Sequence, residues 1–258
     1  MRVITTNLNG IRSAAKKGFF DWLKTQKADV VCLQETKAHM NSLDGEEFRP
    51  KDYYCHYADA VKKGYSGVGI FCRQQPDKVI TSLGWPHADE EGRYIQADFG
   101  KLSIASLYLP SGSSGLDRQK IKFDFLDRYL KVLKKIRQSN RSIIICGDWN
   151  IVHKEIDIKN FKSNQKNSGC LPEERAWLDE VLTKVGFTDA FRVVNQEAEQ
   201  YTWWSNRGRA YEKNVGWRID YQVITSDLKD KVKKATIYKE KRFSDHAPLI
   251  VDYEGIGV

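Results

Sequence analysis

The sequence has no long apolar run. None of its hydrophobic stretches reaches the roughly 18 residues that a membrane-spanning helix needs, so no membrane contact is expected. The first residues alternate apolar and polar side chains without the apolar segment of a secretory signal, which predicts a strand and a cytoplasmic protein. Proline is scarce, with 6 in 258 residues, and no low-complexity tract marks a linker. We therefore expect one domain over residues 1–258, monomeric by default.

Cysteine is also scarce, and its arrangement excludes two common kinds of site. The chain has 5 cysteines and no C-x-x-C pair. Three of them, Cys32, Cys72 and Cys146, lie in apolar runs that are typical of buried strands. Buried, reduced thiols explain this pattern better than a zinc site or a disulfide framework.

The chain is rich in aromatic residues and in positive charge. Its 7 Trp, 12 Tyr and 11 Phe can fill a large core, which excludes intrinsic disorder. Lys and Arg together number 42 against 34 Asp and Glu, a formal net charge of +8. This balance favours a phosphate-rich partner.

Short strand-like runs dominate the chain and three helical segments interrupt them. The predicted strands are rich in Val, Ile and Tyr and end at Gly, Asp, Asn or Lys; they are Arg2–Asn7, Asp29–Glu35, Ser66–Arg73, Lys78–Leu83, Arg93–Phe99, Leu102–Pro110, Ser142–Asp148, Asp220–Thr225, Ala235–Lys239 and Pro248–Tyr253. Helical spacing predicts helices over Lys16–Gln26, from Asp117 to Ile136, and from Pro172 to Gly186. We therefore predict an α/β fold of two packed sheets with helices outside, not a βαβ repeat.

Four predicted loops share cationic, amide and aromatic residues: Gly10–Gly18, Lys62–Tyr65, Lys159–Gly169 and Trp203–Trp217. Each one alone is explained by an ordinary solvated loop. Their shared composition is what contact with phosphates and nucleobases requires.

Acidic and amide residues stand where apolar strands stop, which is the main functional signal. Strand termini hold side chains rigidly beside loops that leave room for a substrate. The residues concerned are Asn7, Glu35, Asp148, Asn150, Asp220, Asp245 and His246. Each alone could be a turn or cap residue, but a set of this size predicts a site.

The chemistry of this set favours a hard divalent ion and a phosphate ester. Carboxylate and amide oxygens suit Mg²⁺ or Mn²⁺, and no Cys or His cluster exists for zinc. A histidine beside an aspartate can act as an oriented imidazole that donates to a phosphoryl oxygen. In-line attack on a phosphodiester needs an activated water, charge neutralisation and help for the leaving oxygen. The set could supply each of these.

Seven blocks, in order from Asn7 to about Tyr253, resemble the exonuclease III / abasic-site (AP) endonuclease family. They are NLNGIRSA, VVCLQETK, GYSGVGIF, YLPSG, CGDWNIVHKEIDIKN, NVGWRIDYQVIT and FSDHAPLIVDY. The resemblance implies a four-layer α/β sandwich, the endonuclease/exonuclease/phosphatase fold, with mostly antiparallel sheets. It also implies an Mg²⁺-dependent DNA repair nuclease, with Mn²⁺ as a substitute, that cuts 5′ to abasic sites and trims 3′ ends. Its partner would be double-stranded DNA with abasic sites or blocked 3′ ends.

The resemblance further implies roles for the residues at the strand ends. Glu35 would be the principal metal ligand, with Asn7 and Asp245 close to the ion and Asn9 in its outer shell. Asp148 would orient or deprotonate the attacking water, and Asn150 would hold that water or the phosphate. His246, fixed by Asp220, would donate to a phosphoryl oxygen, and Tyr108 would contact the phosphate or aid the leaving group. Asp148, Asn150 and His246 could equally hold a second ion or a water.

A second group of residues matches the family's DNA contacts. Arg93, Asn164 and Asn167 match positions that contact DNA phosphates, and Lys37 could hydrogen-bond within the carboxylate network near the DNA. Trp203 and Trp217 match a pocket for a flipped-out abasic sugar, whose missing base makes extrusion cheap. From residue type alone, the tryptophans and Tyr108 could be packing residues, and Lys37 a solvated lysine.

One departure from the family pattern keeps an alternative open. Ser111 stands where the family generally has asparagine, and YLPSGSSG and EERAWLDEV resemble the catabolite repression control proteins of pseudomonads. Those relatives assist an RNA chaperone in translational repression and lack the catalytic residues, so RNA and a chaperone are alternative partners. This chain retains Glu35, Tyr108, Asp148 and Asp245. Clustered carboxylates without a metal would repel one another, which favours the enzyme. A lipid or inositol phosphoesterase is less favoured because no apolar interfacial patch is visible.

Overall fold

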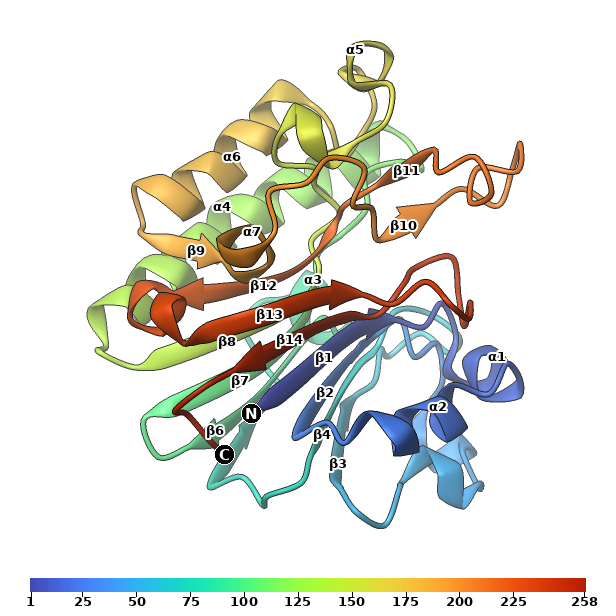
Figure 1. Ribbon diagram of the computed structural model, residues 1–258, viewed down its shortest axis with the longest axis vertical. Coiled ribbons are helices and arrows are strands. Elements are labelled where there is room, and N and C mark those ends of the chain that lie inside the picture. The colour runs from blue at the N-terminus through green and yellow to red at the C-terminus, as the bar shows by residue number, and fades with distance from the viewer.

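Two six-stranded sheets lie face to face in the computed structural model, which describes residues 1–258 (Figure 1). The strand order is β13-β14-β1-β2-β4-β3 in the first sheet and β5-β6-β7-β8-β12-β9 in the second. The β1–β2 and β7–β8 pairs are parallel, and all other neighbours in these two sheets are antiparallel. Strands β10 and β11 form a separate two-stranded ribbon.

The strands are mostly short and end at polar residues. Their bounds are β1 (Arg2–Asn7), β2 (Val30–Gln34), β3 (Tyr54–Ala58), β4 (Val68–Cys72), β5 (Lys78–Ile80), β6 (Tyr94–Phe99), β7 (Leu102–Tyr108), β8 (Ser142–Asp148), β9 (Phe187–Asp189), β10 (Trp203–Trp204), β11 (Gly216–Trp217), β12 (Asp220–Thr225), β13 (Val232–Ile237) and β14 (Leu249–Tyr253).

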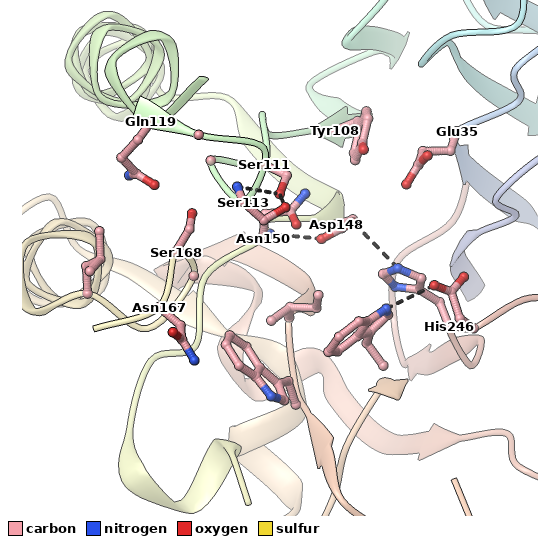
Figure 2. Close-up of a pocket in the computed structure, with 18 of the residues that line it drawn as sticks. Glu35, Tyr108, Ser111, Ser113, Gln119, Asp148, Asn150, Asn167, Ser168 and His246 are labelled. Atoms are coloured by element: carbon pink, nitrogen blue, oxygen red, sulfur yellow. Dashed lines mark hydrogen bonds and ion pairs between the residues drawn. The ribbon is translucent and has the colours of Figure 1, made fainter. Parts of the chain in front are cut away.

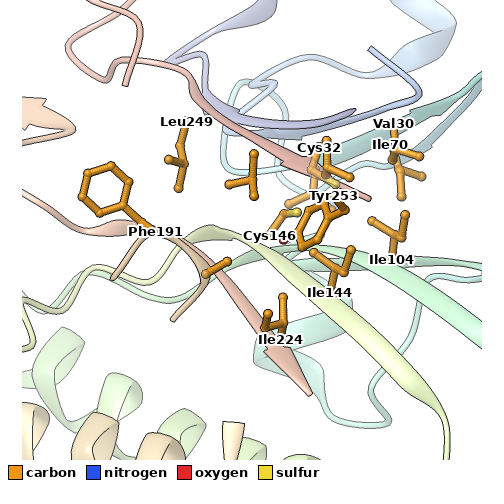
Figure 3. Close-up of a cluster of buried hydrophobic side chains, with 14 of the residues drawn as sticks. Val30, Cys32, Ile70, Ile104, Ile144, Cys146, Phe191, Ile224, Leu249 and Tyr253 are labelled. Atoms are coloured by element: carbon orange, nitrogen blue, oxygen red, sulfur yellow. The ribbon is translucent and has the colours of Figure 1, made fainter. Parts of the chain in front are cut away.

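Most helices lie outside the two sheets, whereas α7 (Ala190–Val194) packs between them, with Ala190 and Phe191 in the central core (Figure 3). The other helices are α1 (Ile11–Lys16), α2 (Phe19–Gln26), α3 (Pro86–Asp89), α4 (Leu116–Gln138), α5 (Phe161–Asn164) and α6 (Pro172–Thr183), with 3₁₀ turns at Met40–Ser42, Glu46–Phe48, Glu155–Asp157 and Ser226–Lys231. Helices α1 and α2 lie beside the first sheet, and α4 and α6 lie beside the second (Figure 1). None of the helices combines the length and apolar character that crossing a bilayer requires.

Three apolar layers hold these four layers of backbone together. The central one lies between the sheets, where Cys32 and Ile70 of the first sheet face Ile104, Ile144 and Cys146 of the second (Figure 3). The two outer layers lie between helices and sheets: α2 packs against the first sheet, and α4 and α6 pack against the second. Removing a large side chain from such a layer typically costs about 2–5 kcal/mol. The predicted α/β sandwich with helices outside is confirmed.

The structure also corrects several predicted elements. Strand β13 begins at Val232, three residues before the predicted start, because exposed Lys233 and Lys234 on this edge strand hide its alternation. The strands β3 and β9 were missed because one is a partly exposed edge strand and the other has three residues. The predicted helix Lys16–Gln26 begins three residues later, as α2 at Phe19, because Gly18 before it has a left-handed φ of 83°. Two predicted loops contain the short helices α1 and α5, and the Trp203–Trp217 loop contains the β10–β11 ribbon.

Candidate active site

The predicted strand ends meet at one edge of the sandwich. Asn7 ends β1 and Glu35 follows β2, so their parallel pairing brings both to the same edge of the first sheet. In the second sheet, parallel β7 and β8 place Tyr108 beside Asp148, and antiparallel β12 places Asp220 beside Asp148 on its other side. The topology therefore brings side chains from both sheets together.

Asn7 connects the two sheets at this edge. Its buried Nδ2 donates to Glu35 Oε1 at 2.7 Å and to Asp148 Oδ2 at 2.9 Å. Its Oδ1 accepts from the backbone N–H of Asn9 at 2.9 Å. Asn7 was predicted to lie close to the metal; in this arrangement it presents its amide nitrogen, not its oxygen, to the two carboxylates and so fixes their separation.

Asp148 is a buried carboxylate with an unusual pKa. One oxygen accepts from the backbone N–H of Asn150 at 2.8 Å, and the other accepts from Asn7. Burial raises the pKa of Asp148 to about 7, because the charge of His246 only partly offsets burial and the negative charges of Asp220 and Glu35. A carboxylate with this pKa can accept a proton near neutral pH.

His246 is held by Asp220 and faces Asp148. Its Nδ1 lies 2.9 Å from Asp220 Oδ2, and its Nε2 lies 3.8 Å from Asp148 Oδ2. Burial lowers the pKa of His246, but the charges of Asp220 and Asp148 outweigh it and raise the pKa to about 10. The imidazole is therefore a cation and a donor at neutral pH.

Glu35, Asp148 and His246 form a group that could hold a metal ion. One ligand atom from each lies within 4.8 Å of the others. Burial raises the pKa of Glu35, but the positive charge of Lys37, with its Nζ 2.7 Å from Oε2, holds that pKa below its ordinary value. Ionised carboxylates converging in this way suit a hard divalent cation. Asp245 lies beyond this group, where its oxygens accept from Asn9 Nδ2 at 2.9 Å and Trp203 Nε1 at 3.1 Å.

A cavity of about 750 Å³ opens over this cluster. Figure 2 shows Glu35, Tyr108, Asp148 and His246 gathered around its base, with Asn167 and Ser168 on the far wall. Trp203 and Trp217 line the same cavity, and their ring centroids are 5.9 Å apart at an interplanar angle of 83°. Burial, and then the charge of Glu35, raise the pKa of Tyr108, so its hydroxyl stays protonated.

Not every predicted DNA contact lies in the cavity. Asn167 lines it, whereas Asn164 sits on α5 and accepts from Asn167 Nδ2 at 2.8 Å. Arg93 was predicted to contact a DNA phosphate, but its side chain is 1% exposed. It donates to the Glu91 carboxylate, the Tyr65 hydroxyl and the Tyr108 carbonyl, so it braces the strand that carries Tyr108.

Sequence reasoning missed two charged residues behind the cavity wall. Lys122 and Glu174 form a fully buried ion pair at 2.7 Å between α4 and α6. The sequence does hint that Lys122 is buried, because helical spacing puts it on the same face of the helix as Phe125 and Tyr129. Glu174 was less visible, since a glutamate two residues after Pro172 is typical of an ordinary helix start.

Comparisons with known proteins agree with this geometry. A family model described as the Endonuclease/Exonuclease/phosphatase family matches residues 4–246. The chain is 38% identical over 251 residues to an exodeoxyribonuclease of Bacillus subtilis (strain 168), covering 96% of this chain and 98% of that protein. It is 36% identical over 254 residues to the DNA repair nuclease APEX1 of Danio rerio, covering 96% and 81%. A solved AP endonuclease from Archaeoglobus fulgidus superposes with a TM-score of 0.89 at 26% identity, covering 98% of this chain and 99% of that one.

Proposed function

This chain belongs to the endonuclease/exonuclease/phosphatase family, and we propose that it is an Mg²⁺-dependent DNA repair nuclease that cuts the phosphodiester 5′ to abasic sites and trims 3′ ends. It is an enzyme of the exodeoxyribonuclease and AP endonuclease type, as its relatives are named. The observation that carries the proposal is the convergence of Glu35, Asp148 and His246 beneath a cavity lined by two tryptophans. No observation favours the RNA-associated alternative over a nuclease.

Glu35 would be the principal ligand of the divalent ion, with Asp148 beside it. His246, as an imidazolium, would act as a donor and not as a ligand. When bound, such an ion neutralises charge on the phosphoryl oxygens and stabilises the leaving oxygen. Asn7 donates to Glu35 and Asp148 together, which holds their oxygens apart at a fixed spacing. Lys37 keeps Glu35 ionised and therefore able to bind a cation.

Asp148 would take the proton of the attacking water. Its pKa of about 7 matches that task, since a base works best when its pKa is close to the working pH. The side-chain amide of Asn150 donates to the Leu109 carbonyl at 2.9 Å, which keeps this side chain at the cavity wall beside Asp148. From there its amide oxygen could hold the water or the phosphate.

His246 and Tyr108 would donate to the phosphate oxygens. Asp220 holds His246 Nδ1, so the other ring nitrogen is directed at the cavity as a charged donor. Tyr108 keeps its proton because its pKa is raised, and it can therefore donate as well. Donors fixed in a buried site stabilise developing charge more strongly than water does.

The tryptophan pair would receive the extruded abasic sugar. Trp203 is anchored through its Nε1 to Asp245, and the edge of one indole meets the face of the other. A sugar without a base leaves the duplex at low cost and can enter such an apolar cleft. Asn167, which lines the same cavity, would contact the flanking phosphate.

A cleavage assay on one duplex tests this proposal. A labelled duplex with a single abasic site is incubated with the protein in Mg²⁺, in Mn²⁺ or in EDTA, beside the Asp148→Asn variant. We expect one product cut 5′ to the site with either metal, none in EDTA, and at least a thousandfold slower cutting by the variant. An uncut duplex with the wild-type protein and Mg²⁺ would refute the proposal.

A further inference from the structure

A buried ion pair lies behind the cavity wall, where it contacts none of Glu35, Asp148 and His246. Lys122 of α4 and Glu174 of α6 are both 0% exposed, and Lys122 Nζ lies 2.7 Å from Glu174 Oε1. Burying two charges costs desolvation energy, and well-packed apolar residues often stabilise a core equally well. Fold stability alone therefore does not account for charged residues at these two positions.

The lysine reaches the loop that carries Asn150. Its Nζ donates to the Asn150 carbonyl at 2.8 Å, and Asn150 adopts a left-handed backbone with φ of 51°. Asparagine is one of the few residues with a side chain that adopts this conformation readily. Lys122 thus holds the peptide group that follows Asn150. The N–H of Asn150 itself donates to Asp148, and its side chain lies at the cavity.

The glutamate reaches the opposite loop. Its Oε2 accepts from the backbone N–H of Gly169 at 2.5 Å and of Leu171 at 3.2 Å, and its Oε1 accepts from Gln119 at 3.0 Å. At Gly169, which has a φ of 92°, a Cβ would lie 3.0 Å from the Asn150 oxygen and 3.1 Å from the Trp217 ring. The two loops therefore pack backbone against backbone, and the pair holds both from behind.

We infer that Lys122 and Glu174 are positioning residues of the proposed nuclease, which lock the Asn150 loop and the Asn167–Leu171 loop at the spacing that the cavity requires. The inference rests on the proposed function of the same site. An error of about 1 Å in the placement of a reacting group can lower a rate by about a hundredfold. The pair can thus act on Asn150 and on the wall at Trp217 without touching the substrate.

A purely structural role is the competing explanation. Glu174 stands at the third position of α6, and its bond to the Leu171 N–H is an ordinary helix cap. A cap does not require the bonds to Gly169, Lys122 and Gln119, which lie outside this helix. If the role is purely structural, a neutral and well-packed replacement leaves catalysis unchanged. If the pair positions the loops, the same replacement slows catalysis.

The test is the double variant Lys122→Met, Glu174→Gln, which removes both charges and keeps the volumes. The matched control is Lys134→Met, Glu180→Gln, because Lys134 and Glu180 join the same two helices at 3.0 Å but lie far more exposed and outside the cavity wall. Cleavage of the abasic duplex, thermal unfolding and amide exchange by NMR are measured for each. The informative amides are those of Val152, which donates to the Gly169 carbonyl across the two loops, and Cys170, which donates to the Asn167 carbonyl within one of them; neither bonds to the pair.

We expect kcat of the double variant to fall about 10–100-fold, with a smaller change in KM and an unfolding midpoint within a few degrees of the wild type. Exchange at Val152 and Cys170 should accelerate, while the control matches the wild type in all measurements.

An unchanged kcat, or an equal loss in the control, would overturn the inference. If the double variant does not fold, Glu174→Gln alone replaces it under the same criteria. Inactive wild-type protein would refute the proposed function instead, and the exchange rates would still decide whether the pair orders the loops.

Discussion

Asp220 and His246 form a buried pair in which the carboxylate Oδ2 lies 2.9 Å from the ring Nδ1. This contact fixes which ring nitrogen faces the cavity. The nearby charges of Asp220 and Asp148 also keep the imidazole protonated, with a pKa raised to about 10 although burial lowers it. The pair thus makes a donor that stays charged over the whole neutral range.

Replacing Asp220 by Asn should shift the pH dependence of cleavage. Without the Asp220 charge the pKa of His246 falls, so the imidazolium is lost at a lower pH. We expect kcat to fall about a hundredfold or more at pH 7.5, with the alkaline decline beginning at lower pH than in the wild type. A pH–rate profile of both proteins in saturating Mg²⁺ measures this. An alkaline decline that begins at the same pH in both proteins would contradict the assigned role.

Replacing Asp148 by Asn should stabilise the protein while abolishing cleavage. The pKa of Asp148 is raised to about 7 in the fold, mainly by burial, so the ionised carboxylate destabilises the fold above its ordinary pKa. The neutral amide avoids that cost. We expect an unfolding midpoint at least about 3 °C higher at pH 8 in EDTA, which corresponds to about 1 kcal/mol. The gain should shrink toward pH 5, where the carboxyl is protonated, and a pH-independent gain would argue against burial as its cause.

Asp157 should give the opposite pH dependence of stability. Burial raises its pKa, but buried Arg218 and then Arg192 outweigh burial and lower the pKa to about 2 from its ordinary value of 3.8. The ionised group therefore stabilises the fold above about pH 4 by about 2 kcal/mol, and this contribution is lost as the pH falls toward 2.

The Asp157→Asn variant tests this. Urea unfolding at pH 7 should show a loss of about 3–5 kcal/mol, because buried Arg218 and partly buried Arg192 lose their shared carboxylate. The difference from the wild type should narrow by about 2 kcal/mol at pH 2.5. Asp21→Asn, which removes an exposed surface pair with Lys24, is the control and should change little at any pH. If the difference in unfolding free energy between the variant and the wild type stays constant with pH, the ion pair is not the source of that difference.

Replacing Arg93 by Met separates bracing from direct DNA contact. A lost phosphate contact lowers the slope of log Kd against log salt by about one. Because Arg93 is buried against Tyr108, we expect that slope to be unchanged, while kcat falls about tenfold through displacement of Tyr108. Fluorescence binding titrations at several salt concentrations provide the slope. A shallower slope would restore Arg93 as a phosphate contact.

The site could be predicted from the sequence because its residues lie at strand ends. Asn7, Glu35 and Asp148 follow runs whose pattern is readable without a structure, and parallel pairing brings such ends to one edge. The burial of Arg93 could not be predicted, since its partner Tyr65 is 28 residues away. The Lys122–Glu174 pair was equally hidden, because it depends on how two outer helices pack. Local pattern predicts the elements, whereas the roles of charged side chains depend on packing between elements that lie far apart in the sequence.

Glu35, with Asp148 beside it, should bind the ion that cleavage needs. Mn²⁺ is titrated into metal-free protein with an abasic duplex, and bound Mn²⁺ by electron paramagnetic resonance and cleavage rate are measured in the same samples for wild type and Glu35→Ala. We predict that the cleavage rate of the wild type rises in proportion to bound Mn²⁺, and that both fall together in the variant at concentrations that saturate the wild type. Cleavage by metal-free protein, or an Ala variant that binds and cuts like the wild type, would contradict the account.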